Sequence, residues 1–398
     1  MRLPRFVAPA GTVLRGSDLL GWLRGAGTGH AALDGLEAAF RARYGRRHVF
    51  FLSSGRAGMT ILLRALAERA PGRSEVAVPG YTCYSVAASA VRAGLTVRPL
   101  DVAPAAMDIA PEARDSLDPA RTLALVATSL YGLPAALPAH ETWARQHDVA
   151  LVDDAAQCLD GQVGGRWSGT FGDAGLFSFD KGKNITALQG GVVTCDDDEL
   201  ADRLARHFRA MPAPGAGTVA AQSLQLLAYT VLLRPWLYWL PNRLLRLGET
   251  PFELEYPTTR FAPSLAALVG RQFARIDAIT GSRVAHAARL RAGLAGAPGL
   301  LIPGDPSARN VHPRFAIVFA DGVRRDATLA RLVDGGIGAT GSYPLALRDV
   351  PGLAPYLAAD TADTPRARAV ARGLLTLPTH GHVTDRDLAA MVTLITRP

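Results

Sequence analysis

The chain has 398 residues, of which 48% are apolar and 20% are charged, and its formal net charge is +8. This length exceeds what one hydrophobic core usually organises, so we expect a large domain and a smaller one. The composition excludes a disordered chain. The positive charge comes from arginines spread along the sequence, without the dense basic run of a nucleic-acid-binding arm, so we expect no nucleic-acid partner.

The cysteines and the N-terminus bear on the cellular compartment. Cys83, Cys158 and Cys195 have neither CxxC spacing nor Cys/His metal spacing, so we expect neither disulfides nor a metal site. The first 16 residues lack the continuous apolar stretch of a secretory signal. We therefore expect a cytoplasmic protein.

Hydrophobic periodicity over the first half of the chain predicts alternating helices and strands. The expected helices cover residues 31–44, 57–69, 85–93 and 139–147. The expected strands cover residues 48–52, 75–78, 96–100, 123–128, 149–152 and 174–179, with residues 190–194 as the second strand of a hairpin. This alternation predicts an α/β domain with a mainly parallel seven-stranded sheet and helices on both faces.

The second half predicts a smaller α+β domain. A long helical pattern covers residues 263–294, a strand pattern covers 314–319, and further helices are expected at 327–334 and 385–395. We place the large domain at residues 1–255 and the small C-terminal domain at residues 256–398.

A hydrophobic, tryptophan-rich segment, residues 224–247, interrupts the large domain. It contains Trp236 and Trp239 among leucines and arginines and is broken by Pro235 and Pro241. These prolines make it too interrupted to span a bilayer. Two interpretations stay open: an insertion packed on the large domain or on a dimer partner, and an interfacial element that gives peripheral membrane contact.

Chemically useful residues follow the predicted strands, where ligands bind in open α/β sheets. Lys183 is a candidate for covalent attachment of pyridoxal 5′-phosphate (PLP) as a Schiff base, and Asp154 is a candidate partner for the pyridine nitrogen of that cofactor. Residues 54–57 open a helix whose free N–H groups can bind a phosphate, and Ser178 can add a hydroxyl. Each signal is weak alone, but their order and spacing together indicate a PLP site.

The longest informative stretch is LVDDAAQCLDGQVGGRWSGTFGDAGLFSFDKGKNITALQGGVVT, residues 151–194. With SSGRAGMTILLRAL, VPGYTCYSVAASAVRAGLTVRPLDV, TSLYGLPAAL, GIGATGSYP and LLTLPTH, it resembles the DegT/DnrJ/StrS family of PLP-dependent sugar aminotransferases. The resemblance covers nearly the whole chain. It implies the PLP-dependent transferase fold type I, related to aspartate aminotransferase, and a homodimer.

The resemblance also implies roles for individual residues. Lys183 would carry the cofactor, and it is favoured over Lys181 because the family's lysine directly precedes an asparagine. Asp154 would bind the pyridine nitrogen, and Gln157 would contact the phenolic oxygen. The residues implied for phosphate binding are Gly55, Arg56, Ala57 and Ser178.

Four positions depart from the family pattern. Cys83 stands where an aromatic ring usually stacks on the cofactor, and Thr258 stands where an asparagine reaches the phosphate from the neighbouring subunit. Ser342 replaces a histidine, and Gln189 replaces an acidic residue. These departures suggest a divergent substrate, because the lysine and the carboxylate remain.

The resemblance implies an aminotransferase that moves an amino group from an amino acid donor, glutamate in the family, to a keto-sugar linked to a nucleotide. Such a keto substrate belongs to polysaccharide, glycolipid or secondary-metabolite biosynthesis. Sugar dehydratases of the same family are a second hypothesis, but they typically carry histidine at the position of Lys183. A third is a divergent protein that acts on a lipid-linked or non-sugar ketone, or a weakly catalytic protein bound to a membrane or a partner.

Overall fold

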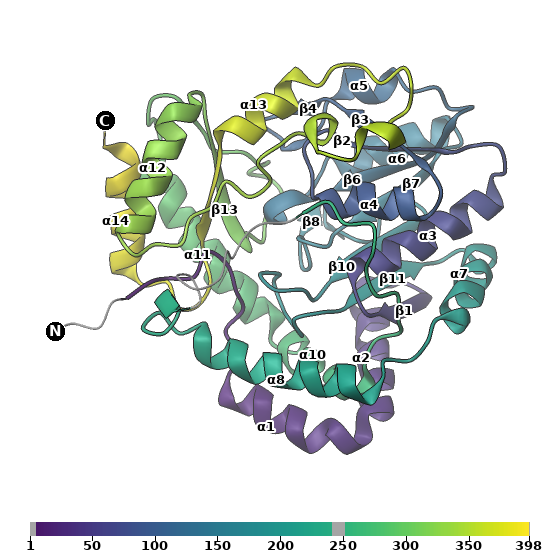
Figure 1. Ribbon diagram of the computed structural model, residues 1–398, viewed down its shortest axis with the longest axis horizontal. Helices are drawn as coiled ribbons and strands as arrows, with labels where there is room; N and C mark the ends of the chain where they lie inside the picture. Colours follow the sequence, from purple (N-terminus) through teal and green to yellow (C-terminus); the bar gives the residue numbers. More distant parts are fainter. Residues whose placement is uncertain (1–4, 241–250, 398) are drawn as a thin grey trace.

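The computed structural model describes residues 5–240 and 251–397, and its large domain is built on a seven-stranded sheet (Figure 1). In spatial order the strands are β1 (His48–Leu52), β11 (Gly191–Cys195), β10 (Ala174–Ser178), β7 (Ala150–Asp154), β6 (Thr122–Thr128), β2 (Glu75–Pro79) and β3 (Thr96–Leu100). Only β11 runs antiparallel to its neighbours in this sheet. The predicted mainly parallel sheet and its hairpin are confirmed.

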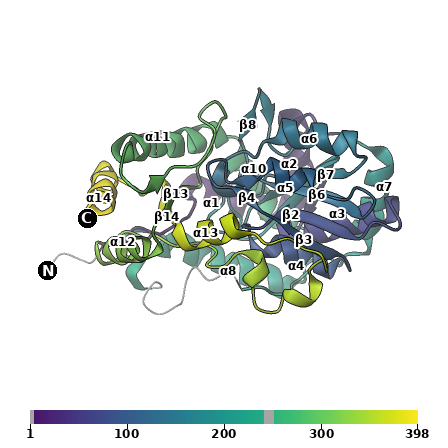
Figure 2. The same ribbon diagram turned by 90° about the horizontal axis from the view of Figure 1, so that it is seen from above.

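Helices cover both faces of this sheet, and Figure 2 shows the sheet between them. One face carries α3 (Gly55–Arg69), α4 (Tyr84–Arg92) and α7 (Asp198–Ala210). The other carries α2 (Gly29–Tyr44), α5 (Pro111–Asp115), α6 (Leu137–Gln146) and α10 (Ala266–Phe273). All seven residues of β6 are buried, as expected for a strand that helices cover on both sides.

Aromatic side chains tie the first helices to the sheet. Phe40 on α2 stacks on Phe273 of α10 with 4.6 Å between ring centroids, and it meets Phe51 of β1 and Phe177 of β10 edge-on at 5.5 and 5.7 Å. Offset and edge-on arrangements are the favourable ones for aromatic pairs. This cluster fixes α2 and α10 over β1 and β10, at the end of the sheet that carries the candidate lysine loop.

The C-terminal domain contains a three-stranded antiparallel sheet in the order β12 (Leu300–Leu301), β13 (Arg314–Phe319) and β14 (Leu374–Pro378). Its helices are α11 (Ile276–Leu294), α12 (Gly322–Asp334), α13 (Pro365–Gly373) and α14 (Asp385–Thr396). Short strand pairs elsewhere are β4 (Val102–Ala103) with β5 (Asp108–Ile109), and β8 (Gln162–Val163) with β9 (Arg166–Trp167). The single helix predicted over residues 263–294 is wrong.

That region instead forms a short 3₁₀ turn (Pro263–Leu265), then α10 and α11, with a break at residues 274–275. Tertiary contacts on either side explain the break. The Gln272 amide bonds to both backbone groups of Thr186, while the Arg275 side chain turns to Asp18 on α1 (Gly16–Gly25). The two side chains thus bond to different parts of the large domain at the point where the helix is interrupted.

The N-terminal segment lies beside the small domain, as Figure 1 shows. Val7 donates to Gly336 and accepts from Gly338, and its side chain belongs to the small domain's core. The His380 ring bonds to the carbonyl of Ala8. The chain therefore passes over the small domain before α1 reaches the large one, while the division at residue 255 stays a prediction.

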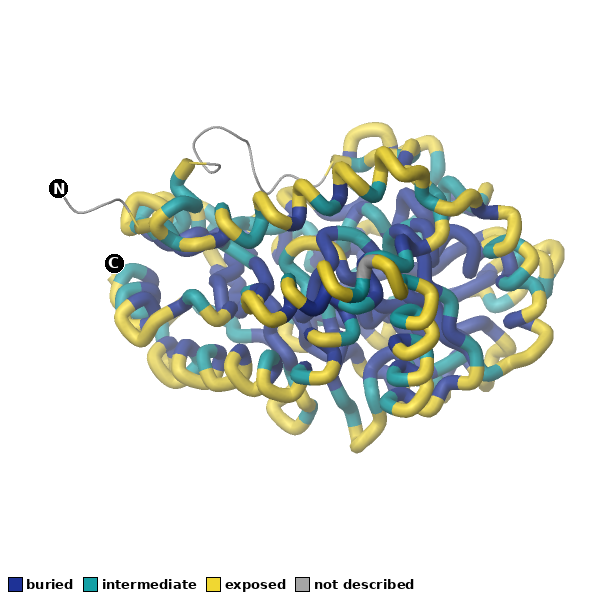
Figure 3. Tube along the Cα trace, turned by 90° about the horizontal axis from the view of Figure 1, so that it is seen from below, coloured by how far each residue is buried: buried dark blue, intermediate teal, exposed yellow. Residues whose placement is uncertain are grey.

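The hydrophobic segment begins within α8 (Ala216–Leu232), and its residues 241–247 lie outside the described part of the chain. Leu226 and Leu233 face inward, whereas Leu224, Val231 and Trp236 are 69%, 50% and 48% exposed. Figure 3, which views the molecule from the side of α1 and α8, shows exposed residues along both helices. Across residues 5–240 and 251–397, no helix has the length and apolar character needed to cross a membrane.

Asp153 anchors the loop after β9 to the end of β7. Its Oδ2 accepts from the N–H groups of Gly169 at 2.5 Å and Phe171 at 3.3 Å, and its side chain has no contact with solvent. Burial raises the pKa of Asp153 to about 7. An unfolded aspartate has a pKa of about 3.9, so between these values the folded protein keeps a proton that the unfolded chain loses. The contribution of this carboxyl to stability therefore falls as the pH rises through this window.

We predict that Asp153→Asn raises the melting temperature relative to wild type by more at pH 8 than at pH 5. The amide oxygen can still accept from Gly169 and Phe171 but loses no proton, so the cost of keeping the carboxyl neutral disappears. Thermal unfolding of both proteins across this pH range measures the difference. The same difference at both pH values would contradict the shifted titration.

Candidate functional site

A cavity of about 450 Å³ opens at the carboxyl ends of the central strands. The ends of β7 and β10, the first turns of α3 and α4, and residues 251–257 surround it. The sequence-predicted site residues that line it are Gly55, Arg56, Cys83, Asp154, Gln157, Ser178 and Lys183. Ala57 and Thr258 are not among its lining residues. The fold therefore brings seven of the nine predicted residues to one cavity.

Asp154 is the last residue of β7 and is 3% exposed. Burial raises the pKa of Asp154, while the N–H of Ala156 at 3.1 Å and the charge of Lys183 oppose that shift. A buried carboxylate stays ionised only where a cation or several donors compensate it. The site thus favours a cationic group next to this carboxyl.

Lys183 lies in the loop between β10 and β11, and its backbone is held on both sides. Its N–H donates to the carbonyl of Asp180 at 3.3 Å, and its carbonyl accepts from the hydroxyl of Thr12 at 2.7 Å. Lys181 also lines the cavity but is exposed. Lys183 is therefore the more firmly placed of the two lysines.

The first turn of α3 forms an anion cradle against β10 and β11. Ser54 caps the helix by accepting from the N–H of Ala57 at 3.1 Å, so the N–H groups that face the cavity are those of Gly55 and Arg56. Gly191 must be a glycine, because a Cβ there would lie 2.5 Å from the Gly55 nitrogen. Ser178 stands opposite, where its side chain would be in ordinary contact with a Cβ added at Gly55. This close approach leaves backbone donors and a hydroxyl around one small space.

Gln157 follows β7 and reaches into the same cavity from the other side. Its Oε1 accepts from the N–H of Tyr131 at 3.2 Å, and its Nε2 donates to the hydroxyl of Tyr343 at 3.2 Å.

Cys83, just before α4, is half-buried and accepts from the hydroxyl of Ser85 at 3.0 Å. No aromatic ring replaces it there: among the described lining residues, Tyr256 alone is aromatic.

Sequence reasoning missed Tyr256 and the segment around it. Its ring lies between the guanidinium groups of Arg56 and Arg92, at 4.7 and 4.1 Å, and its hydroxyl bonds to Thr60 at 2.6 Å. Glu253 from the same segment pairs with Arg56 at 3.6 Å. In the sequence, Tyr256 is an isolated aromatic residue before Pro257, and no local pattern connects it to α3. This anchoring closes one side of the cavity and brings Thr258 beside it.

The residue set fits PLP on three independent observations. A cation beside Asp154 would offset the cost that burial puts on its carboxylate, a lysine lines the same cavity, and a capped helix start approached through Gly191 offers donors for a phosphate. The described residues contain no group of three or more His, Cys, Asp or Glu that could hold a metal ion. The lysine, the carboxyl and the helix start together fit the three functional groups of PLP: its aldehyde, its ring nitrogen and its phosphate.

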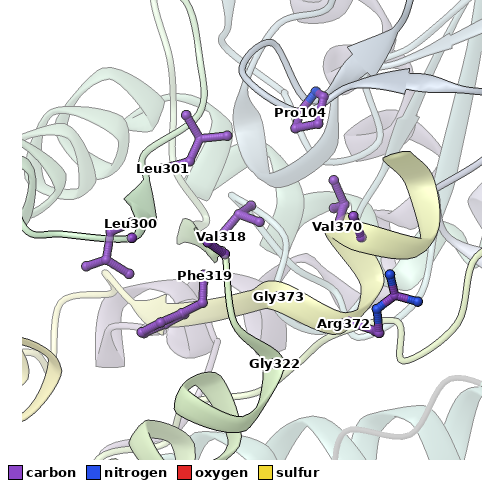
Figure 4. Close-up of a pocket in the computed structure, with 12 residues that line it drawn as sticks. Pro104, Leu300, Leu301, Val318, Phe319, Gly322, Val370, Arg372 and Gly373 are labelled. Atoms are coloured by element: carbon purple, nitrogen blue, oxygen red, sulfur yellow. The ribbon is translucent and has the colours of Figure 1, made fainter. Parts of the chain in front are cut away.

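A second cavity of about 410 Å³ lies between β13, α13 and the loop at Pro104 (Figure 4). Its walls include Leu300, Val318 and Val370, and among its described lining residues Arg372 alone is charged. None of the predicted site residues contributes to it. It therefore offers no catalytic constellation.

Comparisons with known proteins identify the family of the chain. The model of the DegT/DnrJ/EryC1/StrS aminotransferase family matches residues 21–396. A dTDP-3-amino-3,4,6-trideoxy-alpha-D-glucose transaminase of Streptomyces venezuelae is 29% identical over 354 residues, which cover 88% of this chain and 83% of that protein.

Solved structures show the same fold. S. venezuelae DesV is 25% identical, with a TM-score of 0.74 and 98% of both chains covered. E. coli GDP-4-keto-6-deoxy-D-mannose-3-dehydratase, solved with bound hydrated PLP, is 15% identical, with a TM-score of 0.79 and 99% and 100% coverage of the two chains. The predicted fold type I is thus confirmed. The chain belongs to the DegT/DnrJ/EryC1/StrS aminotransferase family and is a PLP-dependent transaminase.

Proposed function

We propose that this enzyme moves an amino group from an amino acid, glutamate as the first choice, to a keto-sugar linked to a nucleotide. The observation that carries the proposal is the single cavity lined by Lys183, Asp154 and the start of α3. The similarity to a transaminase named for a dTDP-sugar supports the substrate class.

Two residues do the chemistry in this proposal. Bound PLP supplies an electron-withdrawing ring next to the reacting carbon. The Asp154 carboxylate keeps a proton on the ring nitrogen of the cofactor, which its buried position near a cation favours. The Lys183 Nζ would hold the cofactor covalently, and the free amine would move a proton between the substrate carbon and the cofactor's C4′ atom.

The remaining residues position the cofactor. The N–H groups of Gly55 and Arg56 and the hydroxyl of Ser178 hold the phosphate, where the helix dipole of α3 favours an anion. Gln157, whose amide is bonded to Tyr131 and Tyr343, would contact the phenolic oxygen. Ala57 contributes through its bond to the capping Ser54 rather than through the phosphate itself. Thr258, which does not line the cavity of its own chain, would reach the phosphate bound in a partner subunit, as the resemblance to the family implies.

The nucleotide-linked acceptor has a physical basis in the cavity. Arg56 and Lys181 line it and are partly or fully exposed, so they offer cations to an incoming diphosphate. Acidic side chains at Asp180 and Glu253 stand beside them and limit how much negative charge the site accepts.

A half-reaction tests the substrate class. Glutamate should convert the cofactor to its amine form, and a nucleotide keto-sugar should convert it back. If a lipid-linked ketone alone converted it back, the proposed acceptor would be refuted.

We predict that Lys183→Ala abolishes covalent attachment of PLP, whereas Lys181→Ala retains it. Both lysines line the cavity, but the backbone of Lys183 is fixed by Thr12 and Asp180. Borohydride reduction followed by peptide mass spectrometry locates the cofactor. A label on residue 181 in the wild-type protein would overturn the assignment.

We predict that Asp154→Asn still binds PLP but lowers turnover by about a hundredfold or more, because an amide does not stabilise the protonated ring nitrogen. Asp180→Asn is the matched control, since Asp180 lines the same cavity but is exposed. Single-turnover kinetics with glutamate measure both variants. Unchanged turnover in Asp154→Asn would refute its role.

The homodimer, the cytoplasmic location and the peripheral membrane contact of residues 224–247 stay predictions. The exposed side chains of Leu224, Val231 and Trp236 support an apolar contact of that segment with another surface. Sedimentation of the enzyme alone and with lipid vesicles separates a partner subunit from a membrane.

A further inference from the structure

Four buried tyrosines join the large domain to a loop of the small domain. We call Tyr81, Tyr84, Tyr131 and Tyr343 the tyrosine cluster; Tyr343, its most exposed member, is 7% exposed. The hydroxyls of Tyr81 and Tyr131 lie 3.2 Å apart. The ring of Tyr343, from the small domain, lies 6.1 Å from that of Tyr81 and 5.6 Å from that of Tyr84. The cluster therefore spans the domain boundary next to the candidate site.

The cluster fixes both ends of the Gln157 amide. The amide oxygen accepts from the backbone N–H of Tyr131, and the amide nitrogen donates to the hydroxyl oxygen of Tyr343. An amide group has two N–H donors, so one remains for the cavity that Gln157 lines. A flipped amide would turn its NH₂ group towards the Tyr131 N–H. The orientation of this donor is thus set by one bond from each domain.

Tyr343 keeps its proton throughout the ordinary pH range. Burial raises its pKa well above the usual value, and the neighbouring Cys83 thiol adds to the shift. Its hydroxyl therefore stays protonated beside Cys83, and its oxygen accepts from Gln157. The thiol at the position of the missing aromatic ring thus belongs to the same network.

Backbone strain marks this contact on both sides. Tyr131 has φ 55° and ψ 19°, and Ser342 has φ 58°, conformations that residues other than glycine rarely adopt. The Ser342 side chain, close to the Tyr131 hydroxyl, opposes the rise that burial causes in the pKa of Tyr131. Strained conformations persist where the surroundings over-determine them, and they gather at functional sites. The two loops are consequently held against each other in one arrangement.

We propose that Tyr343 is a positioning residue that the small domain supplies to the cofactor site: it aims the free N–H of Gln157 at the ring oxygen of PLP. This inference rests on the proposed function, which puts that oxygen at Gln157. The physical consequence follows from the donor. An N–H group that donates to the ring oxygen of PLP favours the anionic form of that oxygen. If Tyr343 no longer holds the Gln157 amide in place, this hydrogen bond weakens, and the bound cofactor keeps its proton to a higher pH.

The test is Tyr343→Phe, which removes the hydroxyl and keeps the ring. We expect the pH midpoint of the absorbance change of bound PLP to rise by about half a unit to one unit. Tyr84→Phe is the matched control, because its hydroxyl bonds to both backbone groups of Leu345 and not to Gln157. Tyr84→Phe should lower the melting temperature without moving the midpoint.

A second experiment, in a Gln157→Leu protein, tests whether Tyr343 acts through Gln157. In a Gln157→Leu protein, Tyr343→Phe should add no further shift, since the group that it positions is gone. Equal midpoints in wild type and Tyr343→Phe, or an equal shift in Tyr84→Phe, would overturn the role of Tyr343 alone. An absent cofactor band in the wild-type protein would instead contradict the proposed function, and this role with it.

Discussion

The structure depends on one buried carboxyl, Asp154, held at the end of a central strand. A carboxylate in this position is costly unless positive charge compensates it, and the Lys183 charge and the Ala156 N–H do so only in part. The parallel register that pairs Leu176 with Asp154 places β10 beside β7 and so directs the following loop, with Lys183, back to the same cavity. Sheet register and loop path thus bring the carboxyl and the lysine to one cavity, where a cofactor with a cationic ring would compensate the buried charge.

The Lys183 loop is supported by segments from three distant parts of the sequence. Thr12 of the N-terminal segment bonds to its carbonyl, and the buried Arg283 on α11 bonds to Thr12 in turn. Tyr229 on α8 accepts from the N–H of Thr12 at 2.8 Å. The hydrophobic segment is therefore linked to the Lys183 backbone through Thr12, while Leu224, Val231 and Trp236 of the same segment are exposed. Two hydrogen bonds, from Thr12 to Tyr229 and from Thr12 to Lys183, would therefore connect Lys183 to a surface that covers α8.

Local sequence patterns predicted the helices and strands well, because the hydrophobic pattern of each strand reflects how that strand is buried. The predicted limits of β1, β3 and β13 agree with the structure to the residue. The continuous helix over residues 263–294 was wrong because Gln272 and Arg275 follow contacts that no local period records. The role of Tyr256 was invisible for the same reason: two arginines from α3 and α4 surround it only after folding.

The sequence alone determined the fold class, the family, and the order of lysine, carboxylate and helix start, because these depend on short motifs with fixed spacing. Tertiary structure decided the rest. It brought seven of the predicted residues to one cavity, left Ala57 and Thr258 off its wall, and joined Gln157 to Tyr343 across 186 positions of the chain. Hydrogen bonds and burial between distant segments have no local sequence signature, since each partner alone is an ordinary polar residue.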